Sequence, residues 1–404
     1  MLRSLQNRLF TFLWSGQTIS RLGDSLYRIA LSWWVLEKTG SAAAMATVNV
    51  ASMVPMLLFM LFGGVLVDRL PRPLVMFISD FLRGILMAAV AILAALNLLA
   101  VWEVYIISIM FGAVSAFFEP AYIAVFPEII SPESLPSANS LTTLSREITG
   151  IAGPSIGALL IAAGGIPITF GLDAASFFIS TITLIPLLRI SLKPVMKKEN
   201  AVKANVWADL TSGVRAVAAS PWLWVTITIA ALSNMMEGGT ISTSLPFLVK
   251  DTWKLDVKSL GFIYSAISAG AVITAIIMGN WKKLRKRGPV AYISWFVIGI
   301  MIVALGSQHN FGVSLAIAAV IGAAATSFGL IWTNSLQELV PRNLLGRVSS
   351  IDYLGSFVLM PIGYAAAGWA TDRFGPAVVF IAGGSAVAIL SLLALLHPAI
   401  RKMD

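Results

Sequence analysis

Charged side chains inside long apolar stretches are the residues of this sequence most suited to chemistry. Arg21, Asp24 and Arg28 lie in the first such stretch, and their spacing places all three on one face of a helix. A charge at the centre of a bilayer costs about 2.5–3.5 kcal/mol on insertion scales, so such groups pair with one another or line a wet cavity. The two arginines would hold Asp24 ionised. The pattern fits either a structural ion cluster or a site that titrates and contacts substrate.

Glu237 differs because its own stretch contains no basic residue before Lys250. Asn234 stands about one helical turn away, and Gly238 and Gly239 follow and can break the helix. A carboxylate without a basic partner in a low dielectric can take up and release a proton. We therefore expect Glu237 to bind a proton or a cationic substrate. The alternative is a carboxylate hydrogen-bonded to Asn234 or to a neighbouring helix.

The remaining charges within apolar stretches have neighbours of opposite sign. Asp80 and Arg83 are expected to pair within their helix or with a neighbouring helix. Glu119 and Arg146 would approach each other across two helices, as a gate or a structural pair. Asp352 lies near the cytoplasmic end of its stretch, where a nearby arginine can neutralise it. We retain Glu119, Arg146 and Asp352 as further candidates for proton or substrate binding.

The elements that must position these groups are membrane-spanning helices. Hydrophobic residues make up 58% of the 404 residues and charged residues only 12%, against about 25% charged in soluble domains. A spanning helix needs about 20 apolar residues, and twelve stretches qualify: 9–36, 42–67, 73–97, 101–126, 138–164, 166–188, 222–249, 258–281, 288–307, 312–336, 344–371 and 376–396. We predict an all-α membrane protein of twelve spanning helices.

The longest hydrophilic gap divides the chain into two halves. It predicts a six-helix bundle over 1–188, a cytoplasmic central loop over 189–221 and a second six-helix bundle over 222–404. Within the gap, 207–217 is expected to form a short helix on the membrane surface. The loops on one side hold most of the 28 lysine and arginine residues; those on the other side hold only Lys38, Lys250, Lys254, Lys258 and Arg373. Both termini are therefore predicted to be cytoplasmic.

Several functions are disfavoured by what the sequence lacks. It has no Walker-type phosphate loop, no cysteine and only two histidines, so neither ATP-driven transport nor a metal site is expected and no cofactor is predicted. Without cysteine and with only two histidines, the chain also has few groups that could act as nucleophile or acid–base catalyst, which argues against a membrane-embedded lipid-modifying enzyme. The net charge of +9 suits anionic lipid headgroups rather than nucleic acid.

The loop after the second stretch reads Gly64-Val65-Leu66-Val67-Asp68-Arg69-Leu70-Pro71-Arg72. Gly64 permits a close helix approach, and Asp68 is suited to accept from N–H groups at the start of another helix. Arg69 and Arg72 would hold the turn at the cytoplasmic face. The loop resembles the G-x-L-x-D-R-x-x-R signature of the major facilitator superfamily, whose aspartate helps to latch the cytoplasmic side shut at the start of the eleventh helix. A plain charged loop is the alternative. The shorter G-x-x-x-D-R core at Gly368–Arg373 is expected to face outside, where that cytoplasmic role is not available.

The fifth stretch carries Gly150, Gly153, Pro154 and Gly157 on one helix face. This resembles the G-x-x-x-G-P-x-x-G pattern of exporters in the superfamily, called the antiporter motif, with a shorter first spacing and Ala158 in place of the final glycine. The motif implies antiport; simple packing of small residues is the alternative.

Two motifs in the first half narrow the resemblance to one branch of the superfamily. Ser20-Arg21-Leu22-Gly23-Asp24-Ser25 and Phe118-Glu119-Pro120-Ala121 resemble the branch of the superfamily that holds macrolide-efflux proteins and bacterial siderophore exporters. The resemblance implies a secondary transporter that exports a small amphiphilic molecule by proton antiport and alternating access. It would work as a monomer, surrounded by lipid, in the bacterial inner membrane. A metabolite importer and a lysolipid or lipid flippase on the same fold are the alternatives.

Overall fold

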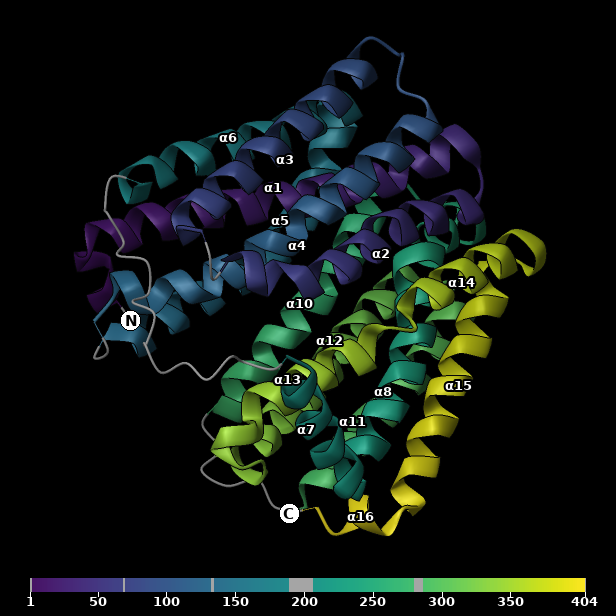
Figure 1. The fold of residues 1–404 in the computed structure, drawn as a ribbon. Coiled ribbons are helices and arrows are strands. Elements are labelled where there is room, and N and C mark those ends of the chain that lie inside the picture. The colour runs from purple at the N-terminus through teal and green to yellow at the C-terminus, as the bar shows by residue number, and fades with distance from the viewer. Residues whose placement is uncertain (1, 68–69, 132–133, 189–205, 280–285, 404) are drawn as a thin grey trace. The chain divides into compact units, whose positions relative to one another are not determined.

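The computed structural model describes residues 2–67, 70–131, 134–188, 206–279 and 286–403, and all of its long elements are helices. The first half forms α1 (Arg8–Thr39), α2 (Ala42–Val67), α3 (Arg72–Ala95), α4 (Val101–Ile129), α5 (Leu135–Gly164) and α6 (Ile166–Leu188) (Figure 1). Helices are the expected outcome of such apolar stretches, because in lipid each backbone group must find its hydrogen-bond partner within the segment.

The second half is helical throughout its described residues. It contains α7 (Val206–Ala219), α8 (Pro221–Gly239), α9 (Leu245–Phe247), α10 (Val257–Gly279), α11 (Arg287–Ser307), α12 (Phe311–Leu339), α13 (Arg342–Phe357), α14 (Met360–Phe374), α15 (Pro376–Leu396) and α16 (Pro398–Arg401). The π-helical turns Thr240–Ser244 and Leu248–Thr252 continue α8 on either side of α9. The short helix expected over 207–217 is confirmed as α7, whereas 189–205 lies outside the described residues.

Ten described segments are long and apolar enough to cross a bilayer, and the segment Gly213–Thr252, bent by 101° before α8, adds an eleventh. The helix α1 spans 32 residues but carries its three charges in the middle and is not in that count. Large apolar side chains face outward on these helices; Ile92, Ile182 and Ile276 are each more than half exposed, as expected for lipid contact. These segments support a multi-pass membrane protein. If α1 also crosses the membrane, the total is the predicted twelve, and that number stays a prediction.

Two compact units divide the chain. Unit 1 comprises Met1–Gly40, Thr47–Lys198 and Asp256–Ser265, and unit 2 comprises Ser41–Ala46, Glu199–Leu255 and Ala266–Asp404. The start of α2 thus belongs to unit 2 and the start of α10 to unit 1. In unit 1, α6 packs against both α1 and α3. In unit 2, α11 packs against α15 and α12. The predicted boundaries at 188 and 222 stay predictions.

An ion pair recurs at corresponding places in the two halves. Arg72, the first residue of α3, pairs with Glu128 near the end of α4. Arg287, the first residue of α11, pairs with Glu338 near the end of α12. The same contact between the same pair of helices in each half supports an internal repeat.

Candidate functional site

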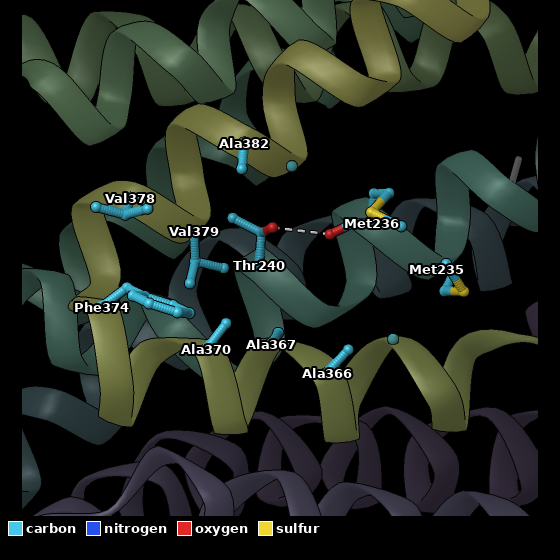
Figure 2. Close-up of a pocket in the computed structure, with 12 residues that line it drawn as sticks. Met235, Met236, Thr240, Ala366, Ala367, Ala370, Phe374, Val378, Val379 and Ala382 are labelled. Atoms are coloured by element: carbon cyan, nitrogen blue, oxygen red, sulfur yellow. Dashed lines mark hydrogen bonds between the residues drawn. The ribbon is translucent and has the colours of Figure 1, made fainter.

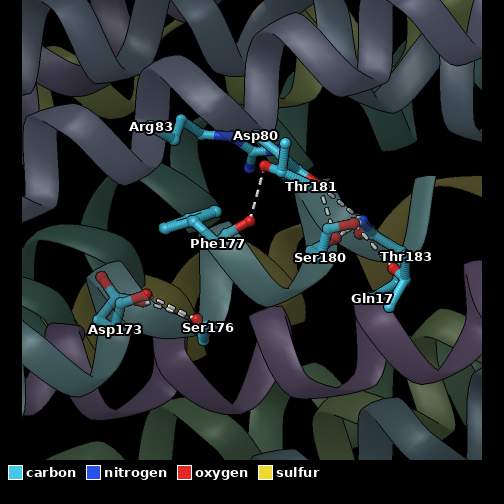
Figure 3. A network of polar contacts seen from close by, with 9 residues as sticks. All are labelled: Gln17, Asp80, Arg83, Asp173, Ser176, Phe177, Ser180, Thr181 and Thr183. Carbon is cyan, nitrogen blue, oxygen red and sulfur yellow. Dashed lines mark hydrogen bonds and ion pairs between the residues drawn. The ribbon is translucent and has the colours of Figure 1, made fainter. Parts of the chain in front are cut away.

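Polar side chains gather where α1, α3 and α6 meet in unit 1. We call Gln17, Asp24, Asp80, Arg83, Asp173, Ser176 and Ser180 the three-helix cluster; Figure 3 shows all of them except Asp24. Two glycines of α1 permit the close approach to α6: a Cβ on Gly16 would lie 1.9 Å from Thr183 Oγ1, and one on Gly23 would lie 2.1 Å from Ser176 Oγ. Small residues thus bring the polar faces of these helices together.

Asp80 is the most fully satisfied acid of the cluster. It is completely buried and forms an ion pair with Arg83 one turn along α3, as the sequence predicted. Its Oδ2 accepts from Gln17 Nε2 at 3.0 Å and from Ser180 Oγ at 2.7 Å (Figure 3). Gln17 Nε2 also donates to Ser180 Oγ at 2.8 Å. These contacts tie α1, α3 and α6 together through one carboxylate.

Arg83 is held on its remaining sides by aromatic rings. Its guanidinium carbon lies 4.3 Å from the ring centroid of Phe118 and 4.8 Å from that of Phe177. Desolvated cation–π contacts of this kind contribute about 2 kcal/mol. Arg83 therefore sits in a closed site made by α3, α4 and α6, with Asp80 as its ion-pair partner.

Asp24 and Asp173 lie beside this closed pair. Asp24 is half-buried in α1 and Asp173 is fully buried in α6. The two carboxylates interact electrostatically with each other, and Arg83 attracts both. Asp173 is a site residue that sequence reasoning missed, although it is the only charged residue in 166–188, which was a usable signal.

Among the described residues no ion pair joins Asp24 to Arg21 or Arg28, although both arginines attract it electrostatically, as the sequence predicted. Arg21 lies with its guanidinium carbon 5.3 Å from the centroid of the Tyr122 ring, and Arg28 is exposed. Glu119 and Arg146 are both exposed, and no ion pair joins them among the described residues. The expected pairing across α4 and α5 is therefore absent from the described residues, although both side chains interact electrostatically with Tyr122.

Glu237 lies near the end of α8 in unit 2. Its carboxylate is half-buried and accepts a hydrogen bond from the Trp295 indole of α11. The Asn234 side chain is not its hydrogen-bond partner among the described residues, because the Asn234 amide donates to the Ser356 main-chain oxygen at 3.0 Å. The expected break follows at once: α8 passes into a π-helical turn at Thr240, a feature often found at functional sites.

Asp352 in α13 also has an indole partner. Trp332 Nε1 of α12 donates to Asp352 Oδ2 at 3.0 Å, and Ser356 Oγ lies 3.4 Å from Oδ1. Trp332 in turn packs edge-on against Trp222, with ring centroids 5.6 Å apart. Both candidate acids of unit 2 thus share one arrangement, a carboxylate held by a tryptophan from a neighbouring helix.

The predicted gate motif is only partly visible. Asp68 and Arg69 lie outside the described residues, as does the environment of Gly64. Within unit 2, however, Asp372 makes the contact expected of such an aspartate. Its carboxylate accepts from the Ala42 and Ala43 main-chain N–H groups at 2.6 and 3.1 Å and from Ser41 Oγ at 2.7 Å. The G-x-x-x-D-R core near the end of α14 therefore caps the start of α2.

The glycines of α5 face two other helices in unit 1. A Cβ on Gly153 would lie 2.4 Å from Ser25 Cβ, and one on Gly157 would lie 3.1 Å from Leu26 Cα, both in α1. Gly150 lies one turn earlier in α5. Beside Pro154, Ser265 Oγ of α10 donates to the Ile151 main-chain oxygen at 2.5 Å. The face packs tightly, which fits both the packing interpretation and the antiporter motif.

Unit 2 contains an apolar cavity of about 390 Å³ between α8, α14 and α15 (Figure 2). Met235, Met236 and Phe374 line it together with small residues of α14 and α15. Thr240 is a polar residue at its wall, and its hydroxyl donates to the Met236 main-chain oxygen at 2.8 Å. The cavity suits an apolar group better than a charged one.

A sequence model described as "transmembrane secretion effector" matches residues 1–404. The chain belongs to the transmembrane secretion effector family. It is therefore a membrane transporter of the major facilitator type, which confirms the predicted family and fold and excludes the lipid-modifying enzyme.

Characterised relatives of this transporter are exporters. Macrolide efflux protein A of Streptococcus pyogenes is 24% identical over 397 residues, covering 98% of this chain and 97% of that protein. The multidrug efflux pump Tap of Mycolicibacterium fortuitum is 26% identical over 391 residues, covering 95% and 94%. The enterobactin exporter EntS of Shigella boydii is 27% identical over 337 residues, covering 83% and 79%. The branch indicated by the first half of the sequence is confirmed.

Solved structures share the fold of this transporter. A bacterial homologue of the iron transporter ferroportin in an inward-facing state gives a TM-score of 0.73 at 15% identity, covering 96% of this chain and 98% of that chain. The nucleoside transporter NupG gives 0.74 at 10% identity, covering 96% and 99%. At such identities the likeness concerns the fold alone.

Proposed function

We propose that this transporter exports a small amphiphilic compound from bacterial cells in exchange for protons. Export is supported by relatives whose names describe efflux of macrolides, of enterobactin and of several drugs. In this proposal the two halves alternately open a binding site to each side of the inner membrane. Both termini lie in the cytoplasm and the monomer is the working unit.

Glu237 carries the proposal of proton coupling. It lies in a bilayer-crossing segment, its hydrogen-bond partner is the Trp295 indole, and no basic residue of the described chain forms an ion pair with it. An indole N–H can remain in contact with a carboxyl group whether or not the group holds a proton. Protonation of Glu237 therefore leaves no unpaired cation behind, and the residue can cycle between charge states at small structural cost.

The amphiphilic substrate class is supported by the cavity of unit 2. Met235, Met236 and Phe374 offer flexible thioethers and an aromatic ring, which suit bulky apolar groups of varied shape. Thr240 supplies a hydroxyl at the wall. Such a lining would accept the apolar part of a macrolide-like molecule, and we propose that Glu237, next to Met236 in α8, meets its polar part.

Inverted membrane vesicles test the proposal directly. Vesicles containing the transporter, with an acidic interior, are expected to accumulate a radiolabelled macrolide, and a protonophore should abolish the accumulation. Empty-vector vesicles serve as the control. Accumulation that persists after the gradient has collapsed would exclude proton antiport, and accumulation only in right-side-out vesicles would indicate import. Enterobactin and a cationic dye, tested alongside the macrolide, would narrow the substrate class.

A further inference from the structure

The start of α2 is capped by an acid from a distant helix. Asp372, near the end of α14, is separated from Ala42 by 330 positions in the chain. Its two carboxylate oxygens accept from the Ala42 and Ala43 main-chain N–H groups and from the Ser41 hydroxyl. The first N–H groups of a helix have no partner inside the helix, and a negative charge there is stabilising. We call the contacts of Asp372 with Ser41, Ala42 and Ala43 the α2–α14 clasp.

A glycine one turn before Asp372 lets the two helices approach. A Cβ on Gly368 would lie 2.5 Å from Ala46 Cβ and 2.8 Å from the Ala42 main-chain oxygen. Positions 368 and 372 are four residues apart, so both lie on the face of α14 that meets α2. The glycine and the aspartate of the G-x-x-x-D-R core thus share one partner, the first turns of α2.

Three other helices are capped by a residue next to their own first turn. Asn7 caps α1 and Asn310 caps α12. At the start of α10, Asp256 Oδ1 accepts from the Ser259 main-chain N–H at 3.2 Å. A local cap of this kind stays with its helix when the helix moves. The cap that Asp372 provides must break if α2 leaves α14.

The helix α2 is shared between the two compact units. Its start, within Ser41–Ala46, belongs to unit 2, and the helix belongs to unit 1 from Thr47 onward. A rigid helix cannot stay with both units when they separate, so the clasp holds the start of a unit 1 helix in unit 2. Asp372 is exposed, so water can replace its contacts once they open, and the cost of opening is modest.

We propose that the α2–α14 clasp is a reversible latch that must open before the transporter opens on the side of the membrane where α2 begins. This inference rests on the alternating access of the proposed function. By the predicted topology that side is the outside, so a closed clasp favours the state that is open to the cytoplasm. Losing the clasp shifts the population toward the outward-open state.

The clasp gives the second G-x-x-x-D-R core a role of its own. The core at Gly368–Arg373 was expected to face outside, where the cytoplasmic latch role of Asp68 is not available. Asp68 lies outside the described residues, and its latch stays a prediction. In this proposal the two aspartates favour opposite states, Asp68 by closing the cytoplasmic side and Asp372 by closing the outer side.

Distance measurements between spin labels test the latch without substrate. The chain has no cysteine, so Leu98→Cys and His309→Cys introduce two unique labelling sites, both exposed and one in each unit. Because consecutive spans reverse direction, both positions lie on the side where α2 begins. Double electron–electron resonance should show a longer distance when this side opens. Asp372→Ala should raise the ratio of long to short distances by about 2- to 30-fold, the equilibrium effect of losing a helix cap.

Two further variants control this measurement. Gly368→Ala should raise the ratio as well, because its Cβ would displace the start of α2, and it serves if Asp372→Ala does not fold. Asp251→Asn removes another exposed acid of unit 2, for which the described residues supply no hydrogen bond or ion pair, and should leave the ratio unchanged. Ser41 Oγ also accepts from the Ala44 main-chain N–H at 3.3 Å, so α2 keeps a cap of its own in Asp372→Ala.

The outcomes separate the latch from the proposed antiport. If neither Asp372→Ala nor Gly368→Ala changes the ratio, the latch is overturned, even when vesicles show gradient-driven export. A lower melting temperature with an unchanged ratio would make Asp372 a structural cap only, and would overturn the latch too. If both variants raise the ratio but vesicle export ignores the proton gradient, the latch stands and the proposed antiport fails.

Discussion

The two units of this transporter treat buried acids in different ways. In unit 1, Asp80 is bound by an arginine, an amide and a hydroxyl from three helices. In unit 2, Glu237 and Asp352 are each held by a tryptophan N–H from a neighbouring helix. Adding a proton to Asp80 would leave the buried Arg83 without its ion-pair partner. Adding a proton to Glu237 or Asp352 would leave no such charge.

The difference indicates which acids can change charge during transport. A buried ion pair resists neutralisation, because breaking it by removal of one partner costs about 3–5 kcal/mol. A carboxylate held by an indole loses at most part of one hydrogen bond. We therefore interpret Asp80 and Arg83 as a structural pair and Glu237 as a group able to titrate.

The largest expected effect comes from breaking the ion pair. Arg83→Met keeps the apolar stem and removes the charge, so Asp80 remains ionised with only Gln17 and Ser180 as partners. We expect the free energy of unfolding to fall by about 3–5 kcal/mol, measured as a lower melting temperature in detergent. Arg28→Met, at an exposed position of the same cluster region, is the matched control. Equal melting temperatures for the two variants would contradict a structural role for the pair.

A second prediction compares Glu237, which is held by an indole, with Asp80, which is held by an arginine. Glu237→Gln retains an acceptor for Trp295 and should fold normally, but it should reduce gradient-driven export by about 5- to 150-fold, the range of ordinary coupling free energies. Asp80→Asn should instead lose stability, because Arg83 loses its counter-ion. When vesicle transport and thermal stability are measured on both variants, Glu237→Gln should therefore lose transport but keep its stability, whereas Asp80→Asn should lose stability. A Glu237→Gln variant that exports like the wild type would move the coupling site elsewhere, with Asp24 as the next candidate.

Removing the indole N–H donors is expected to lower the free energy of unfolding by a smaller amount. Trp295→Phe and Trp332→Phe each leave a half-buried carboxylate without its N–H donor, which costs about 1–3 kcal/mol. Trp14→Phe is the matched control, since its indole donates to the neutral Ser145 hydroxyl at 2.8 Å, and it should cost about 0.5–1.5 kcal/mol. Chemical denaturation of the three variants would rank their losses in the free energy of unfolding. A control as destabilised as the other two would mean that the acids do not depend on their indoles.

The smallest expected effect concerns the repeated ion pair at the helix ends. The Glu338 side chain is 59% exposed, whereas that of Glu128 is 20% exposed. Solvent weakens exposed pairs to about 0–1 kcal/mol, so Glu338→Gln should barely change the melting temperature. Glu128→Gln should lower it more. The reverse order would show that the two halves are not stabilised in parallel ways at this position.

The sequence by itself determined the helices, the family and several residues worth testing. Apolar stretches separated by charged loops leave no other backbone solution in lipid, so most helix positions could be predicted closely. Asp80 and Arg83 were predicted to pair because they lie one turn apart on one helix. Arg21, Asp24 and Glu237 could be singled out because a charge within an apolar stretch is visible without any structure.

Only the tertiary structure decided which partners those charges have. Gln17 and Ser180 are 163 residues apart, and Glu237 meets a tryptophan on a different helix. The spanning helices are apolar over most of their surface, so their sequences do not indicate which polar side chain meets which neighbouring helix. The packing of α1 against α6 through Gly16 and Gly23 brings the α1 backbone up to Asp173, and Arg21 lies over the Tyr122 ring. That packing depends on side-chain contacts between distant segments, which no local pattern specifies.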